Sequence, residues 1–193
     1  MKAEALLQCR RSRLPILALF LSISLPQYSC LFQAIPKNNL GIKIKNFGQI
    51  NENYYRGSQI QEGDVAALGR LGIRTVIDLQ EDGSDEESEW IRDGGMNYFR
   101  IPLSTTRPVT PDQTDYFLML VNDPNHWPVY VHCAAGRHRT GAMTAIHRIT
   151  SDDWTADQAY DEMKKFGYYS FPNHGSLKDY VFDYYRSRTD EQP

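Results

Sequence analysis

The residues best suited to chemistry lie close together in the segment 129–142, which reads VYVHCAAGRHRTGA. Cys133 directly follows a short apolar run typical of a buried strand. Arg139 stands six positions further on, and Thr140 comes next, where a helix is expected to begin. A strand that turns sharply into a helix directs successive backbone N–H groups toward the helix N-terminus. The spacing therefore predicts an anion cradle formed by the loop 133–139.

The side chains of this segment are suited to binding a phosphate group and reacting with it. The Cys133 thiolate, stabilised by the N–H groups and the helix dipole, would be a nucleophile directed at phosphorus. Arg139 offers a planar fork that binds two phosphate oxygens at once, in the ground state and in the transition state. Thr140 would donate its hydroxyl to the Cys133 sulfur, and His132 would order the loop through backbone hydrogen bonds.

The other residues of the loop are expected to present their backbone N–H groups to the phosphate. They are Ala134, Ala135, Gly136, Arg137 and His138. Two of them, Arg137 and His138, also carry basic side chains. These side chains would either meet a second phosphate of the substrate or remain in solvent as ordinary loop residues, and the sequence leaves both interpretations open.

Two further interpretations of the segment compete with nucleophilic chemistry. Cys133 could be a structural cysteine buried beside a basic helix start, although neither Cys9 nor Cys30 has an arginine at the sixth following position. The second interpretation is a metal site, whose ligands would be His126, His132, Cys133 and His138. Their spacing matches no ordinary zinc pattern, and the chain has no CxxC pair. We therefore expect neither a metal nor another cofactor.

The pattern His132-Cys133-x5-Arg139-Thr140 resembles the signature loop of the cysteine-dependent phosphatases, the protein tyrosine and dual-specificity superfamily. The run GRHRT at 136–140 is similar to the loop of plant and fungal atypical dual-specificity phosphatases and their bacterial relatives. The likeness extends to YRGSQ at 55–59, TVIDL at 75–79 and IPL at 101–103. It implies a phosphatase that forms a cysteinyl-phosphate intermediate, without a metal, on phosphorylated tyrosine or serine and threonine residues.

The resemblance also implies a general acid that protonates the leaving oxygen. In ordinary dual-specificity phosphatases this acid is an aspartate in a window that reads LSTT here, at 103–106, without a carboxylate. Atypical relatives carry acidic residues nearer the cysteine, and Asp112, 21 positions ahead of Cys133, matches that placement. Asp115 and Asp82 are the alternatives. Asp112 also follows a proline at an expected helix start. An aspartate there can stabilise the helix end by capping or through the helix dipole and needs no catalytic role.

The elements that must position this loop alternate between strands and helices. Strands are expected at 41–55 (one or two edge strands), 74–79, 97–103 and 128–132, and helices at 61–71, 84–94, from 111, 140–149, 155–166 and 176–186. Such alternation favours an α/β fold, a single layered domain with a central, mostly parallel sheet of four to five strands flanked by helices. The 133–139 loop then joins the last central strand to the following helix.

The first residues of the chain differ in composition from the rest. Within 1–34, four basic residues oppose one glutamate, and an apolar run at 14–25 precedes Pro26. This pattern predicts a signal peptide or N-terminal extension at 1–34, followed by one phosphatase domain at 35–193. The apolar run is shorter than the roughly 20 residues that span a bilayer. A cleaved signal implies a periplasmic or secreted protein, a retained one implies N-terminal membrane association, and the alternative location is the cytoplasm.

Charge and cysteine content limit the partners. The pI near 5.9 argues against nucleic-acid binding, which usually requires a basic surface. Residues 35–193 hold 17 basic and 23 acidic residues and only one cysteine, Cys133. The expected partner is a phosphorylated protein or a small phosphorylated metabolite, with an inositol phosphate or pyrophosphate as alternative. A phospho-ligand binding module without turnover is the other class, although such modules usually lose the cysteine or the arginine.

Overall fold

A computed structural model describes residues 41–170 and 175–190 of the chain. The predicted signal peptide or extension at 1–34 lies outside these residues. Within the described ranges, no helix is long and apolar enough to cross a membrane.

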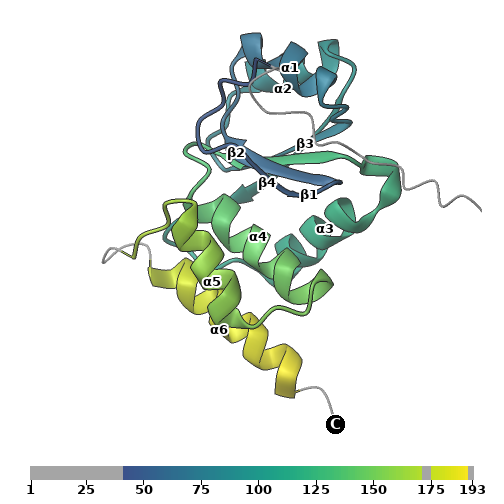
Figure 1. Cartoon of the computed structure of the whole chain (residues 1–193). Helices are drawn as coiled ribbons and strands as arrows, with labels where there is room; N and C mark the ends of the chain where they lie inside the picture. Colours follow the sequence, from purple (N-terminus) through teal and green to yellow (C-terminus); the bar gives the residue numbers. More distant parts are fainter. Residues whose placement is uncertain (1–40, 171–174, 191–193) are drawn as a thin grey trace, which may run out of the picture. The chain divides into compact units, whose positions relative to one another are not determined.

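Five strands form one sheet at the centre of the domain (Figure 1). They are β1 (Gly48–Asn51), β2 (Tyr54–Ser58), β3 (Thr75–Gln80), β4 (Asn97–Leu103) and β5 (Val129–Cys133). The strand order is β1-β2-β5-β3-β4, and neighbouring strands are parallel except for β1 and β2, which are antiparallel. The predicted α/β fold with a mostly parallel sheet of four to five strands is thereby confirmed.

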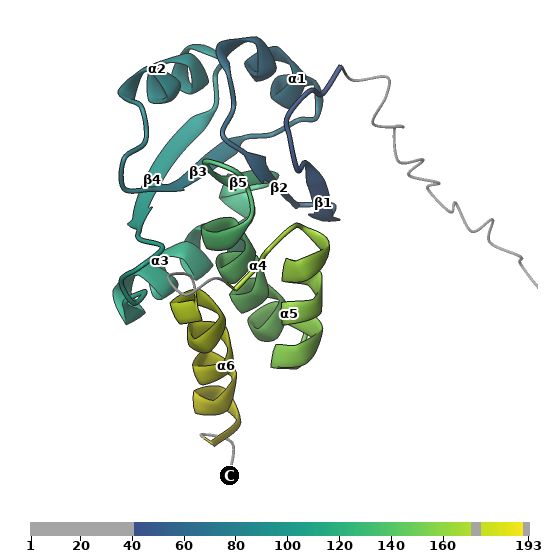
Figure 2. The same ribbon diagram turned by 90° about the vertical axis from the view of Figure 1, so that its left-hand side faces the viewer.

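Helices cover both faces of this sheet. They are α1 (Val65–Arg70), α2 (Asp85–Asp93), α3 (Pro111–Asn122), α4 (His138–Ser151), α5 (Ala156–Lys165) and α6 (Gly175–Asp190). Figure 2 shows α1 and α2 on one face and α3 to α6 on the other. Two expected helices differ at their starts: the one at 61–71 begins as a 3₁₀ turn before α1, and the one at 140–149 begins earlier, at His138.

The central strand β5 belongs to both hydrophobic cores because its side chains alternate between the two faces of the sheet. Val129, Val131 and Cys133 lie in the core with α3 to α6, whereas Tyr130 lies in the core with α1 and α2. All five residues of β5 are buried. Burial on both faces explains why this strand reads as a nearly continuous apolar run rather than as an alternating one.

The helix starts differ in how their backbone donors are satisfied. Thr110 and Thr155 form capping boxes at α3 and α5, and Ser84 accepts a hydrogen bond from the first turn of α2. The residue that precedes α4, Arg137, provides no side-chain cap. Since the first N–H groups of a helix have no partner within the helix, an uncapped start leaves them available to a ligand.

The packing of α3 on the sheet predicts a large stability effect for one side chain. Phe117 is fully buried, and its ring meets the Tyr54 ring edge-on with centroids 6.5 Å apart. Phe117→Ala should lower the free energy of unfolding by about 3–5 kcal/mol in urea denaturation, because it leaves a cavity under α3. The matched control is Tyr116→Ala, at the neighbouring, partly exposed position, which should cost about 1 kcal/mol or less. Equal losses would contradict this packing.

Candidate active site

Cys133 lies at the carboxyl end of the central strand, where α/β sheets bind their ligands. β5 runs between β2 and β3, and Cys133 is only 3% exposed beside Ser58 of β2. The chain then turns through Gly136, which has a positive φ of 65°. A Cβ atom on Gly136 would lie 2.3 Å from the carbonyl oxygen of Gly57. The loop therefore packs against β2 so closely that only glycine fits at this position.

Hydrogen bonds from outside the loop reach three of its carbonyl groups, of which the one from the Asn46 side-chain amide to the Ala135 carbonyl is the longest (3.5 Å). The Ala134 carbonyl accepts from the backbone N–H of Gln59 (3.3 Å), just beyond β2. The Gly136 carbonyl accepts from the Arg56 guanidinium (2.6 Å) and from the Asn46 side-chain amide (2.7 Å). In a trans peptide the C=O and the next N–H point in opposite directions. Carbonyls held toward β2 therefore turn the following N–H groups away from β2.

These N–H groups belong to Ala135 and Arg137. Neither donates a backbone hydrogen bond to another residue in the described part of the chain. The α4 start that follows has no side-chain cap. The 133–139 loop thus combines free backbone donors with the N-terminal end of a 14-residue helix. Such an arrangement attracts anions, as the sequence predicted for this segment.

Arg139 lies in the first turn of α4, and its guanidinium is held at one end. Its Nη1 donates to the Leu103 carbonyl at the end of β4 (3.2 Å), and the side chain is 12% exposed. Its Nε is buried and has no hydrogen-bond partner among the described residues. An unpartnered buried donor costs free energy unless a ligand satisfies it. The fork of Arg139 is therefore anchored on one side and open to an acceptor on the other.

Asp82 is the carboxylate that the structure brings next to Arg139, with Oδ1 3.7 Å from Nη1. It is 80% exposed, on the segment between β3 and α2. The fully buried Asp78 accepts hydrogen bonds from the Gln80 N–H and from Arg100 Nε (2.9 and 3.1 Å). Arg100 in turn donates to the Ser84 carbonyl (2.7 Å). Both ends of the segment that carries Asp82 are thereby fixed.

Asp112 and Asp115, the other acidic residues considered, are exposed on α3. Thr110 is the N-cap of α3 and shares a capping box with Gln113, and Asp112 lies in the first turn of this helix, where a carboxylate interacts favourably with the helix dipole. Among the described residues, Asp112 forms no hydrogen bond or ion pair with the 133–139 loop, and Asp82 alone of the three carboxylates forms an ion pair with Arg139.

His132 interacts with carboxylates and not, as expected, with the backbone of the loop. Both ring nitrogens are buried: Nε2 lies 3.0 Å from Glu87 Oε1, and Nδ1 lies 3.9 Å from Asp78 Oδ1. The other Glu87 oxygen accepts from the Gln59 side chain (3.0 Å). His132 projects to the α1 and α2 face because it alternates with Cys133 along β5. It links α2 to the strand below the loop.

One further expectation for the loop is wrong in this structure. The Thr140 hydroxyl was expected to donate to the Cys133 sulfur, but its oxygen is buried without a partner among the described residues. His138 packs on Tyr168 and Tyr169, with ring centroids 5.1 and 4.6 Å away, so its ring is engaged by the segment after α5. In the described ranges, no group of three or more His, Cys, Asp or Glu side chains could hold a metal ion.

Three polar residues around the loop were not predicted from the sequence as parts of the site. Asn46, Glu87 and Arg56 come from a turn before β1, from α2 and from β2. Arg56 could have been recognised from the sequence. It lies in the middle of β2, a strand whose five residues are all buried, and a charged residue is unusual at such a position. Asn46 and Glu87 had no such signal, since Asn46 contacts the loop, and Glu87 contacts His132 and Gln59 beside it, only through the tertiary fold.

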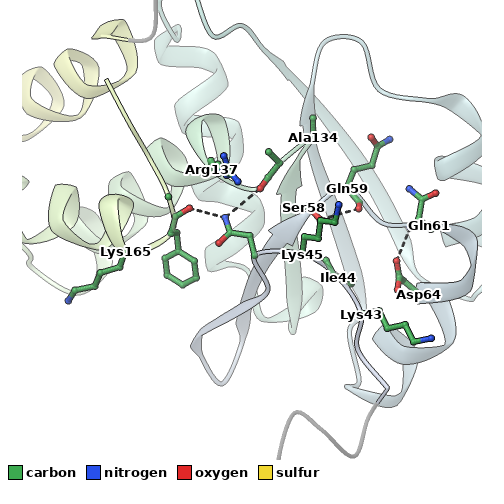
Figure 3. Close-up of a pocket in the computed structure, with 14 residues that line it drawn as sticks. Lys43, Ile44, Lys45, Ser58, Gln59, Gln61, Asp64, Ala134, Arg137 and Lys165 are labelled. Atoms are coloured by element: carbon green, nitrogen blue, oxygen red, sulfur yellow. Dashed lines mark hydrogen bonds between the residues drawn. The ribbon is translucent and has the colours of Figure 1, made fainter. Parts of the chain in front are cut away.

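A hollow of about 820 Å³ adjoins the loop on the side of β2 (Figure 3). Figure 3 shows Ala134 and Arg137 of the loop near one wall, and the residues before β1 near another. Four of its lining residues are basic and one is acidic: Lys43, Lys45, Arg137 and Lys165 against Asp64. The chain as a whole has a net charge of -3. The hollow is therefore a local concentration of positive charge on an acidic protein.

The fold is shared with solved structures of other proteins. The core catalytic domain of the PP-IP phosphatase SIW14 from S. cerevisiae has a TM-score of 0.63 and 21% identity, over 79% of this chain and 97% of that one. TpbA from P. aeruginosa has a TM-score of 0.63 and 23% identity, over 76% and 92%. At these identities the likeness establishes a shared fold.

The chain belongs to the family described as DSP-PTPase phosphatase fused to NAD+ kinase, whose model matches residues 37–176. The dual specificity protein phosphatase TpbA of Pseudomonas aeruginosa is 25% identical over 123 residues, which cover 64% of this chain and 55% of TpbA. The putative tyrosine-protein phosphatase OCA1 of Mycosarcoma maydis is 29% identical over 126 residues, 63% of this chain and 79% of OCA1. The resemblance to atypical dual-specificity phosphatases is confirmed.

A third relative carries a different activity in its name. The inositol diphosphatase SIW14 of Saccharomyces cerevisiae is 23% identical over 150 residues, which cover 75% of this chain and 52% of SIW14. The chain thus spans about half the length of TpbA and of SIW14. The names of these relatives therefore point to two substrate classes, phosphorylated proteins and inositol diphosphates.

Proposed function

We propose that this protein hydrolyses phosphate monoesters through a cysteinyl-phosphate intermediate. The proposal rests on the contacts of the Arg139 guanidinium. Its Nη1 donates to the Leu103 carbonyl, while its buried Nε has no hydrogen-bond partner among the described residues. Arg139 stands at the end of the loop that begins with Cys133. The N–H groups of Ala135 and Arg137, which have no acceptor in the described chain, lie between these two residues. This arrangement supplies a nucleophile, an oxyanion cradle and a fork for two phosphate oxygens.

The reaction has two displacements at phosphorus. The Cys133 thiolate attacks phosphorus, so that the S–P bond forms as the P–O ester bond breaks, and a carboxylic acid gives its proton to the leaving oxygen. Water then attacks phosphorus, the S–P bond breaks, and the carboxylate accepts a proton from that water. Arg139 and the loop N–H groups stabilise the charge on the equatorial oxygens in both steps.

Replacing the two central residues should separate binding from turnover. Cys133→Ser should abolish phosphate release from an aryl phosphate and from a phosphotyrosine peptide, yet it should still bind inorganic phosphate through the loop N–H groups. Arg139→Lys should lose roughly 10³-fold in kcat/KM, because a point charge does not replace the bidentate fork. Retained activity in either variant would refute the mechanism. A wild-type chain that binds phosphate without releasing it from any ester would be a binding module.

The general acid that we propose is Asp112, with Asp82 and Asp115 as alternatives. Thr110 is the N-cap of α3, so the Asp112 side chain is not required as the cap, although its charge lies in the first turn of the helix. Asp82 is favoured by a different observation, its position 3.7 Å from the Arg139 guanidinium. An acid must lie within hydrogen-bond reach of the leaving oxygen when the substrate is bound, so a position near Arg139 suits this task.

Leaving groups distinguish the three carboxylates. If Asp112 is the acid, Asp112→Asn should slow hydrolysis of alkyl or sugar phosphates by roughly 10²–10⁴-fold, because a poor leaving group needs the proton. Hydrolysis of an activated aryl phosphate should fall far less. The same pattern at Asp82→Asn instead would move the role to Asp82. Equal, small effects at Asp112, Asp82 and Asp115 in steady-state kinetics would show that none of them is the acid.

The substrate class that we propose first is a phosphorylated protein, as the names of TpbA and OCA1 suggest. The second candidate is an inositol phosphate or pyrophosphate, as the name of SIW14 suggests. The basic hollow beside the loop favours this second candidate. A substrate that extends from the cradle past the loop to the β2 side would meet Arg137 and Lys45 there with a further phosphate.

Removing the basic charge of the hollow tests this choice. The double variant Lys43→Gln/Lys45→Gln should raise KM about tenfold for an inositol pyrophosphate, because two cations that would face its other phosphates are lost. KM for an aryl phosphate should stay unchanged. The control is Lys164→Gln, an exposed lysine of α5 that does not line the hollow and pairs with Asp161. An unchanged KM for both substrates would leave the phosphorylated protein as the substrate class.

A further inference from the structure

The Gly136 carbonyl receives two strong hydrogen bonds from distant parts of the chain. Arg56 of β2 donates through Nη2 at 2.6 Å, and Asn46 donates through Nδ2 at 2.7 Å. Both donors lie at least 80 residues away in the sequence. A carbonyl oxygen has two lone pairs, and both are occupied here. The orientation of the peptide between Gly136 and Arg137 is therefore determined by these two side chains.

This peptide is part of the predicted anion cradle. Because the peptide unit is planar and trans, the N–H of Arg137 points opposite to the Gly136 carbonyl. Gly136 has a positive φ of 65°, so the loop could adopt other orientations at a low backbone cost. Without Arg56 and Asn46, nothing described at this peptide would keep its N–H turned away from β2.

Arg56 is an unusual residue for the position that it holds. Its side chain is 0% exposed, and its Nε and Nη1 have no hydrogen-bond partner among the described residues. The guanidinium lies 4.1 Å from the centre of the Phe166 ring, and no ion pair of Arg56 is recorded among the described residues. Burial lowers the pKa of Arg56 from its ordinary value. Such desolvation is costly, so the charge is expected to have a use beyond packing.

Asn46 connects three segments with one amide group. Besides the Gly136 carbonyl, its Nδ2 donates to the Phe166 carbonyl at 2.9 Å, at the end of α5. Its own backbone has a positive φ of 54°, which asparagine tolerates better than most residues. The turn before β1, the 133–139 loop and the end of α5 are thus held at fixed positions relative to one another.

We propose that Arg56 and Asn46 are positioning residues that hold the Gly136–Arg137 peptide so that its N–H donates to the substrate phosphate. Neither touches the substrate; each acts through the Gly136 carbonyl. The inference rests on the proposed phosphatase function for its kinetic consequence. Its binding consequence, a weaker affinity for a free phosphate ion, does not require turnover.

The experiment uses the full-length chain with Asn46→Gly, Arg56→Met and Arg56→Lys. Glycine adopts the positive φ of residue 46 without strain, so this variant removes only the donor. Inorganic phosphate binding by calorimetry and kcat/KM on an aryl phosphate are the two readouts. Asn46→Gly and Arg56→Met should bind phosphate about tenfold more weakly or worse, because one oriented donor to the anion is lost. Their kcat should fall by roughly 10²–10³-fold.

Two control variants remove similar groups elsewhere. Arg148→Met removes an arginine that also donates to a carbonyl, that of Ile50, and lies over an aromatic ring, that of Trp154. Asn125→Gly removes a turn asparagine whose amide nitrogen donates to Asp123. Both controls should bind phosphate as the wild type does, whatever their thermal stability. Arg56→Lys keeps a buried cation with donors and should recover part of the affinity lost in Arg56→Met.

The outcomes separate this inference from the proposed function. Wild-type phosphate affinity in both Asn46→Gly and Arg56→Met would overturn the inference, as would an equal loss in Arg148→Met. If the wild type hydrolyses phosphate esters and these variants do too, with unchanged kcat, only the inference fails. If the wild type binds phosphate without hydrolysis and the variants bind it more weakly, the inference holds and the proposed hydrolysis fails. A wild type that binds no phosphate overturns both.

Discussion

The hydrogen bonds that hold the carbonyl groups of the 133–139 loop toward β2 are the constraint on which the candidate site depends. A loop of this length has as many acceptors as donors, and it would attract cations as readily as anions if its peptides turned freely. Binding the Ala134 and Gly136 carbonyls to Gln59, Arg56 and Asn46 leaves the N–H groups of Ala135 and Arg137 without a protein partner in the described chain, whereas the Gly136 N–H donates to the Cys133 carbonyl (3.3 Å). The anion preference proposed for the loop therefore depends on the residues behind it as well as on the start of α4 and on Arg139.

The two faces of the sheet support this loop in different ways. On the face of α1 and α2, the buried carboxylates of Glu87 and Asp78 flank His132, and Asp78 with Arg100 also fixes the segment that carries Asp82. On the face of α3 to α6, Cys133 belongs to the apolar core, and Arg139 reaches the end of β4. Because β5 is central and alternates its side chains, both sets of contacts converge at its carboxyl end. In any parallel sheet of this kind, side chains from both faces come together at the carboxyl ends of the strands, whatever the particular sequence.

Much of the fold was predictable because its signals are local. The central strands are apolar and short, the helices are periodic, and threonine caps mark the starts of α3 and α5. The start of α4 was predicted at Thr140 and lies at His138, because this helix begins without a cap and so lacks the usual signal. The missing cap is itself a feature of an anion site. The expected partners of His132 and Thr140 were wrong for a related reason: a side chain's partner depends on which face of the strand or helix it occupies.

The sequence by itself determined the class of chemistry, since a cysteine, a glycine and an arginine at these spacings between a strand and a helix have few other uses. It also determined the order of strands and helices along the chain, because hydrophobic periodicity is written in neighbouring residues. The tertiary structure alone decided which side chains surround the loop. Asn46, Arg56, Asp82 and Glu87 are separated from Cys133 by 46 to 87 residues, and no local pattern encodes a contact over that distance. Only the strand order, which places β2 and β3 on either side of β5, brings them to one end of the sheet.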